Sequence, residues 1–189
     1  MRTLLSISLA AYLTLPLNTP PEEINRLDDC IQKRFVARTA FGMERVARLD
    51  FHGVRLFRPE NVTEQSVVSA LEQKGYQVAL YLAGRGVNAT PPAWPELAAY
   101  RYKVQGPAYI THFGDPKDAP APASLLEESR KALEAFETGE GYDIQKGDWT
   151  VALRPLRASS TACVQCHKAF GAQVKIGDPI GVVMYAYKR

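Results

Sequence analysis

Three residues of this chain have types and a spacing that can do chemistry. Cys163, Cys166 and His167 form the pattern C-x-x-C-H, which is the attachment signature of c-type haem. Two thiols three positions apart can form thioethers with the vinyl groups on one edge of a porphyrin, and the next imidazole can bind the iron. With three cysteines and three histidines in 189 residues, chance yields on the order of 10⁻³ such matches. The pattern therefore predicts one covalent haem c, with His167 as the proximal iron ligand.

The same residues allow other interpretations. A thioredoxin-type site would normally open a helix within a strand–helix–strand unit, and the sequence indicates no such unit. A zinc site needs four ligands, but the remaining cysteine and histidines are scattered singly. A structural disulfide would leave His167 without a role. The alternative function is therefore a haem-free thiol–disulfide oxidoreductase that uses Cys163 and Cys166.

The residue that faces His167 across the iron would decide what the haem does. An open position binds small ligands, whereas a second strong ligand favours electron transfer. His112, on a predicted strand, is the first candidate for this distal ligand. His52, Cys30 and an open site are the alternatives. Met184 shares a strand face with apolar residues, so we expect it to pack in the core.

Two further sets of residues could line a haem. Arg154 and Arg157 flank the motif and could pair with the haem propionates, although a solvated arginine is the ordinary interpretation. Aromatic side chains on the predicted strands could wall the porphyrin, or they could be ordinary sheet residues, because aromatic residues favour strands. These residues are Tyr100, Tyr102, Tyr109, Tyr185 and Tyr187.

The N-terminus carries an apolar run at residues 4–17, preceded by Arg2. A membrane-spanning helix needs about 20 apolar residues, so this run fits the hydrophobic part of a secretory signal better. We expect a signal peptide at residues 1–18 and a mature domain at 19–189. A buried N-terminal strand or helix is the alternative. The expected location is the periplasm or another exported site, and no other stretch is long enough to span a membrane.

The composition limits the class of protein. Apolar residues make up 46% of the chain and charged residues 23%, which is typical of a globular protein. At 189 residues a single domain is expected. The 23 basic and 20 acidic residues give a net charge of +3 without a basic run, so we expect no nucleic-acid partner. Three cysteines are too few for a disulfide scaffold.

Capping residues and apolar spacing predict three main helices. Thr19 and Glu22 form a capping box with proline in the first turn, and the apolar stripe that follows continues to about Arg38. Cys30 lies off this stripe. The other two helices are expected at residues 61–75 and 125–136.

Strand composition and turn residues divide most of the remaining chain into short strands. Pro155 is expected to end one of them, and Gly139–Gly147 is expected to be a loop. Helices followed by strands with one helix inserted indicate an α+β fold with a mostly antiparallel sheet. The expected strands are Phe51–Phe57, Tyr76–Leu82, Ala99–Gln105, Ala108–Phe113, Trp149–Leu153 and Ile180–Tyr187.

The last 80 or so residues also contain motifs in a recognisable order. A D-P-x-D-x-P turn at 115–120 precedes a helix, a strand that ends near a proline, the C-x-x-C-H motif and a G-D-x-x-G turn at 177–181. In this order the chain resembles the c-type haem domains with a PAS-like fold, which usually have asparagines where the first turn has aspartates. Members occur as small exported proteins and as periplasmic sensing regions of kinases and chemoreceptors.

The resemblance implies a PAS-like, mostly antiparallel sheet with flanking helices and a covalently attached haem. Together with the motif it predicts an exported, single-haem, cytochrome-like protein that transfers electrons or senses redox state or a small gas. A substrate-converting enzyme is not expected. The sequence shows no appended kinase, cyclase or receptor segment, so a sensing role would need a separate signalling protein, and a carrier role would need a redox partner.

Overall fold

The structure is a computed structural model, and it describes residues 20–39, 45–46, 48–49, 55–84, 108–110, 118–139, 141–169 and 173–189. Its helices are α1 (Glu22–Ala37), α2 (Val62–Gln73), the short 3-10 helix η2 (Pro122–Leu125), α4 (Leu126–Ala135) and α5 (Thr161–Ala169). Its strands are β1 (Arg48–Leu49), β2 (Arg55–Leu56), β3 (Gln77–Gly84), β4 (Ala108–Ile110), β5 (Tyr142–Lys146), β6 (Trp149–Arg157) and β7 (Pro179–Lys188).

Five of these strands form one sheet in the order β4-β3-β7-β6-β5, and β1 pairs with β2. Every described pairing is antiparallel. The C-terminal strand β7 lies in the middle and is buried over almost its whole length. The mixed helix and sheet content and the antiparallel sheet agree with the α+β class expected from the sequence.

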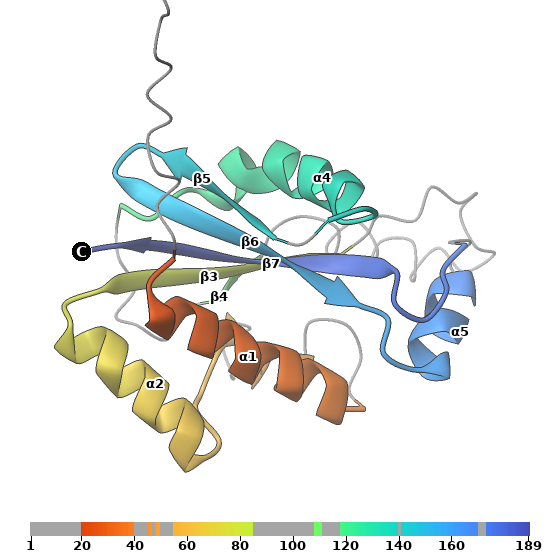
Figure 1. Ribbon diagram of the computed structural model, residues 1–189, viewed down its shortest axis with the longest axis horizontal. Coiled ribbons are helices and arrows are strands. Elements are labelled where there is room, and N and C mark those ends of the chain that lie inside the picture. Colours follow the sequence, from red (N-terminus) through yellow and green to blue (C-terminus); the bar gives the residue numbers. More distant parts are fainter. Residues whose placement is uncertain are drawn as a thin grey trace, which may run out of the picture.

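Helices cover both faces of this sheet (Figure 1). The helices α1 and α2 lie on one face, and α4 lies on the other. Successive residues of a strand point to opposite faces, so β7 contributes to both cores. Val183 and Tyr185 join the cluster beneath α1 and α2, whereas Val182 and Met184 join the cluster beneath α4.

Several local signals of the sequence correspond to observed elements. The Asn61 side chain accepts a hydrogen bond from the Glu64 amide at 3.0 Å and caps α2, and Gly75 follows the helix with φ of +74°. The predicted helix at 125–136 forms as α4, and the short η2 directly precedes it. β3, β4 and β7 fall within or beside predicted strands. The signal segment at 1–18 and the strand expected at Ala99–Gln105 lie outside the described residues.

The helix α1 begins two residues later than the capping box at Thr19 predicts. The N-cap residue is Pro21, which makes no side-chain cap hydrogen bond, and Thr19 lies outside the described residues. The reason is steric, because a residue before a proline is pushed into extended backbone. Thr19 and Pro20 both precede a proline, so the helix begins only after Pro21.

Two boundary predictions near the end of the chain are wrong. The expected loop at 139–147 contains β5, which pairs with β6 across a tight turn where Gly147 has φ of +61°. Pro155 does not end its strand but pairs with Val182 of β7. Since β5 reaches only as far as Leu153, Pro155 lies where β6 has lost one neighbour, and proline is tolerated at such an edge.

Cys30 is more buried than its place off the apolar stripe indicates. It is 7% exposed and lies in the core beneath α1. The helix α1 packs against both the sheet and α2 (Figure 1), so more than one stripe is covered. The buried residues of α1 are Glu23, Ile24, Leu27, Cys30, Ile31, Arg34 and Phe35.

A hydrogen-bonded carboxylate joins α1 to the sheet. The Asp28 carboxylate accepts a hydrogen bond from the Tyr185 hydroxyl of β7 at 2.7 Å and from the Gln32 amide at 3.1 Å. The Gln32 amide also donates to the Pro155 carbonyl of β6 at 3.0 Å. Burial raises the pKa of Asp28, although the bonds from Tyr185 and Gln32 act in the opposite direction.

Asp28→Ala should lower the free energy of unfolding by about 1–3 kcal/mol, because it leaves the buried Tyr185 hydroxyl without its acceptor. Asp28→Asn keeps an oxygen acceptor and should have a smaller effect. Because the folded-state pKa of Asp28 is raised, the contribution of its carboxyl to stability falls as the pH rises through that pKa. The Asn variant should therefore gain stability relative to the native chain between acid and neutral pH. Urea titrations at several pH values measure both effects, and equal losses for Ala and Asn would count against this role.

Candidate functional site

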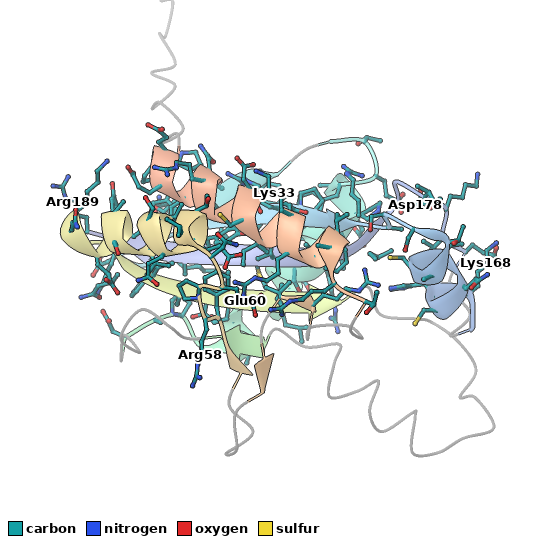
Figure 2. The ribbon with its side chains drawn as sticks, turned by 90° about the horizontal axis from the view of Figure 1, so that it is seen from below. Lys33, Arg58, Glu60, Lys168, Asp178 and Arg189 are labelled. Atoms are coloured by element: carbon teal, nitrogen blue, oxygen red, sulfur yellow. The ribbon has the colours of Figure 1, made fainter. Side chains whose placement is uncertain are left out.

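The C-x-x-C-H motif lies on α5, which stands at one end of the sheet (Figure 1). The chain leaves β6, forms α5 and returns as β7, the antiparallel neighbour of β6. Backbone hydrogen bonds join the two ends of this connection between β6 and β7. The Ala158 amide donates to the Asp178 carbonyl at 2.9 Å, and the Gly177 amide donates to the Ala158 carbonyl at 2.8 Å. Figure 2 shows Lys168 on the outer side of α5, beyond the C-terminal end of α1.

The three motif residues share one face of α5. Positions three and four apart on a helix are neighbours on its surface, which brings Cys166 and His167 beside Cys163. Cys163 is 5% exposed, whereas Cys166 and His167 are half-buried. Both cysteines are free thiols. The face thus presents two sulfur atoms and one imidazole from a single short helix.

Polar groups surround the sulfur of Cys163. Its Sγ lies 3.3 Å from Ser160 Oγ and 3.9 Å from Ser159 Oγ. Arg45 donates to the same sulfur from Nη1 at 3.6 Å. Burial would raise the pKa of Cys163, but the contacts with Ser160, Ser159 and Arg45 outweigh burial and lower the pKa to about 7.

Cys166 has a different electrostatic environment. Burial raises its pKa, and the neighbouring Cys163 acts in the same direction. Arg45 opposes these effects without cancelling them. Since the thiolate is the nucleophilic form of cysteine, the two thiols of the motif differ in reactivity.

The residues on α5 fit the covalent haem that the motif implies. Thioether attachment needs two free thiols, and iron ligation needs a nearby imidazole. Cys163 and Cys166 are both free, and with His167 they lie on one helical face. The half-buried side chains of Cys166 and His167 mean that the protein does not fully cover this face.

The candidates for the distal ligand are not brought together with α5. His112 and His52 lie outside the described residues. Cys30 is buried in the core beneath α1, and burial raises the pKa of its thiol. A higher pKa disfavours the thiolate that would bind iron. Met184 is buried in the core beneath α4, as expected from its strand face.

Both arginines that flank the motif already have oxygen partners in the protein. Arg154 pairs with Asp143 at 3.0 Å. Arg157 donates to the carbonyls of Gly177 and Gly139, each at 3.0 Å. The expectation of two solvated arginines is therefore wrong, since β6 places them against neighbouring backbone. The contacts of Arg157 connect the turn before β7 with the end of α4, whereas Arg154 pairs with β5.

The aromatic residues at the end of the chain pack in the core. Tyr185 is fully buried and donates its hydroxyl proton to Asp28. Tyr187 is buried and meets Tyr76 edge-on, with ring centroids 6.3 Å apart. Tyr100, Tyr102 and the side chain of Tyr109 lie outside the described set.

Sequence reasoning missed the polar groups around Cys163. The Ser-Ser-Thr run at 159–161, one residue before the motif, is a helix-capping signal, so Ser160 could have been found. The amide of Cys163 indeed donates to Ser160 Oγ at 3.4 Å. Arg45 is 118 residues away along the chain, and no local pattern connects it with the motif.

In the described part of the chain, no cluster of three or more His, Cys, Asp or Glu side chains could hold a metal ion. Among the same residues, no helix has both the length and the hydropathy to cross a membrane. The comparisons with known proteins give no further lead: no family model, no curated protein and no solved structure matches this chain.

Proposed function

We propose that this chain is an exported c-type haem protein with one haem, which serves in electron transfer or in sensing redox state or a small gas. Cys163 and Cys166 hold the haem as thioethers, and His167 is the proximal iron ligand. One observation carries the proposal: the C-x-x-C-H residues share a face of α5, with both thiols free. The bound haem would supply a one-electron Fe(II)/Fe(III) couple.

The surroundings of α5 would keep this haem in a fixed position. Hydrogen bonds between Ala158 and the 177–178 turn join the two ends of the β6–β7 connection to each other, next to the sheet. Arg157 adds bonds to Gly177 and to the end of α4. Because both ends of this connection are fixed, α5 and the His167 it carries have little freedom to move relative to the sheet. We assign Arg157 this bracing role and do not place it on a propionate.

The architecture supports a PAS-like domain, which remains part of the proposal. An antiparallel sheet with helices on both faces is compatible with the fold that the C-terminal motifs imply. We further propose that residues 1–18 are a signal peptide and that residues 19–189 form the haem domain. Attachment of c-type haem outside the cytoplasm agrees with export to the periplasm.

Haem staining of a denaturing gel tests the proposal. Protein exported from a host that matures c-type cytochromes should retain peroxidase-type staining after boiling in detergent, because thioethers survive denaturation. The Cys163→Ser/Cys166→Ser variant from the same host is the matched control and should not stain. Native protein that does not stain would refute the proposal.

Carbon monoxide separates the two roles of such a haem. If His112 or His52 binds the iron strongly, the reduced protein should not take up carbon monoxide rapidly, and electron transfer through a redox partner is favoured. Rapid binding would indicate an open site and a sensing role with a separate signalling protein. If the native protein does not take up carbon monoxide rapidly, His112→Ala and His52→Ala should show which histidine binds the iron.

A haem-free thiol–disulfide oxidoreductase is the second candidate, and one observation favours it. Cys163 lies in the first turn of α5 with its pKa lowered to about 7, as in a redox-active C-x-x-C pair. The connection differs, because β6 and β7 are antiparallel rather than the parallel strands of a βαβ unit. Reduction of insulin disulfides by the haem-free chain, abolished by Cys163→Ser, would support this function.

A further inference from the structure

The two cysteines of the motif differ in their neighbours, and this difference has a chemical consequence. We propose that Arg45 and Ser160 are positioning residues that make Cys163 the first thiol of the motif to react. Their contacts with its sulfur favour the thiolate form in the haem-free chain, so the two thioethers form in a fixed order. The ordering of thioether formation rests on the proposed function, whereas the reactivity of Cys163 does not.

The contacts of Ser160 orient its hydroxyl towards the sulfur. Its Oγ accepts a hydrogen bond from the Cys163 amide at 3.4 Å and lies 3.3 Å from Cys163 Sγ. Because the amide occupies a lone pair of the hydroxyl oxygen, the hydroxyl proton can be donated to the sulfur. The position of Cys163 in the first turn of α5 adds the positive end of the helix dipole.

Arg45 brings a positive charge to the same sulfur. Besides its contact with Cys163 Sγ at 3.6 Å, the guanidinium donates to the Phe35 carbonyl at 3.2 Å and lies 5.3 Å from the centre of the Phe35 ring. These contacts hold the guanidinium between the C-terminal end of α1 and α5. An opposite charge at this distance favours the ionised form of a thiol.

The reaction itself needs no electron transfer to or from the sulfur. When a thiol adds to a haem vinyl group, an S–C bond and a C–H bond form while the C=C π bond and the S–H bond are lost. An alkylating reagent probes the same nucleophile: the Cys163 thiolate forms an S–C bond with iodoacetamide as the C–I bond breaks and iodide leaves. Alkylation rates therefore show, without haem, which of the two thiols reacts first.

The test measures alkylation rates on the haem-free, reduced full chain between acid and alkaline pH. The variants Cys166→Ser and Cys163→Ser each leave one thiol in the motif, with Cys30 present in both. Cys163 should react faster than Cys166 below neutral pH, with a midpoint near its pKa of about 7. Arg45→Gln in the Cys166→Ser chain should slow labelling about fivefold at about pH 6.5 and move the midpoint to higher pH.

Three further variants separate an electrostatic role from a structural one. Arg45→Lys retains the charge and should restore most of the rate, which a merely structural role of Arg45 would not predict. Ser160→Ala should also move the midpoint to higher pH. Arg130→Gln, on the far face of the sheet, should change nothing. Equal rates for Cys163 and Cys166, or a midpoint that Arg45→Gln leaves unchanged, would overturn the inference.

The outcomes also separate this inference from the haem proposal. Equal thiol reactivity in a chain that still stains for haem would refute the ordering alone. A reactive Cys163 in a chain that never acquires haem would refute the haem proposal and leave the reactive thiolate in place.

Discussion

The Cys163→Ser/Cys166→Ser variant should lose all covalent haem and unfold at a markedly lower temperature than the native holoprotein. A ligand that binds only the folded chain stabilises that state, and covalent attachment keeps the ligand at a high effective concentration. We expect the free energy of unfolding to fall by at least about 3 kcal/mol. Thermal or urea unfolding of both proteins, produced in the same host, measures this loss.

The loss must be separated from the packing of the thiols themselves. Cys163 is part of the core cluster, so its replacement has an effect of its own. The same double substitution in the chain produced without haem measures that effect, which should be small because serine is close to cysteine in size. Holoprotein stability that the double substitution does not change would contradict a haem that stabilises this fold.

Arg34→Ala should lower the free energy of unfolding by about 3–5 kcal/mol, because it breaks a buried ion pair by removing one partner. The guanidinium pairs with Glu64 of α2, and both side chains are almost fully buried. Arg34 also donates to the carbonyls of Val46 at 3.0 Å and Arg58 at 2.8 Å. Its carbon Cζ lies 4.2 Å from the centre of the Phe57 ring. Urea titration of the variant measures the loss.

The matched control for this variant lies four residues further along the chain. Arg38 pairs with Glu60, whose side chain is 37% exposed. Arg38→Ala should therefore change the stability by no more than about 1 kcal/mol, as is usual for an accessible ion pair. Similar losses for Arg34→Ala and Arg38→Ala would contradict the role assigned to the buried pair.

The Arg34 prediction is connected with the proposed reactivity of Cys163 through the segment at residues 45–46. Arg34 fixes the carbonyl of Val46, and the adjacent Arg45 contacts the sulfur of Cys163. An Arg34 variant that still folds should therefore also lose part of the reactivity of Cys163. The buried pair of Arg34 and Glu64 therefore helps to position the candidate site as well as to stabilise the fold.

Local signals predicted the elements that depend on local chemistry. The cap of Asn61 and the positive φ at Gly75 delimit α2, and the C-x-x-C-H spacing predicts the candidate site without any structure. The apolar stripe located α1 but not its full buried surface. Cys30 is buried because α2 covers a second face of α1, and a helical wheel contains no information about the neighbour of a helix.

Features that depend on tertiary neighbours could not be predicted. In the sequence, Pro155 resembles the end of a strand. It is tolerated inside β6 because β5 stops at Leu153, and no local pattern shows where a neighbouring strand stops. Residues 142–146 form a strand because β6 is present to pair with them, although their own composition is polar. Arg45 reaches Cys163 only after α1, the 45–46 segment and α5 have packed together. Long-range contacts of this kind leave no periodic pattern in a sequence.

The central claim is tested most directly by the denaturing mass spectrum of the exported protein after treatment with an alkylating reagent. If the haem proposal is correct, the mass will equal that of the mature chain plus one haem, and neither Cys163 nor Cys166 will carry the reagent. A pyridine haemochrome spectrum of the same sample should then show two thioether bonds. A mass equal to that of the chain alone, with both cysteines alkylated, would contradict the proposed function.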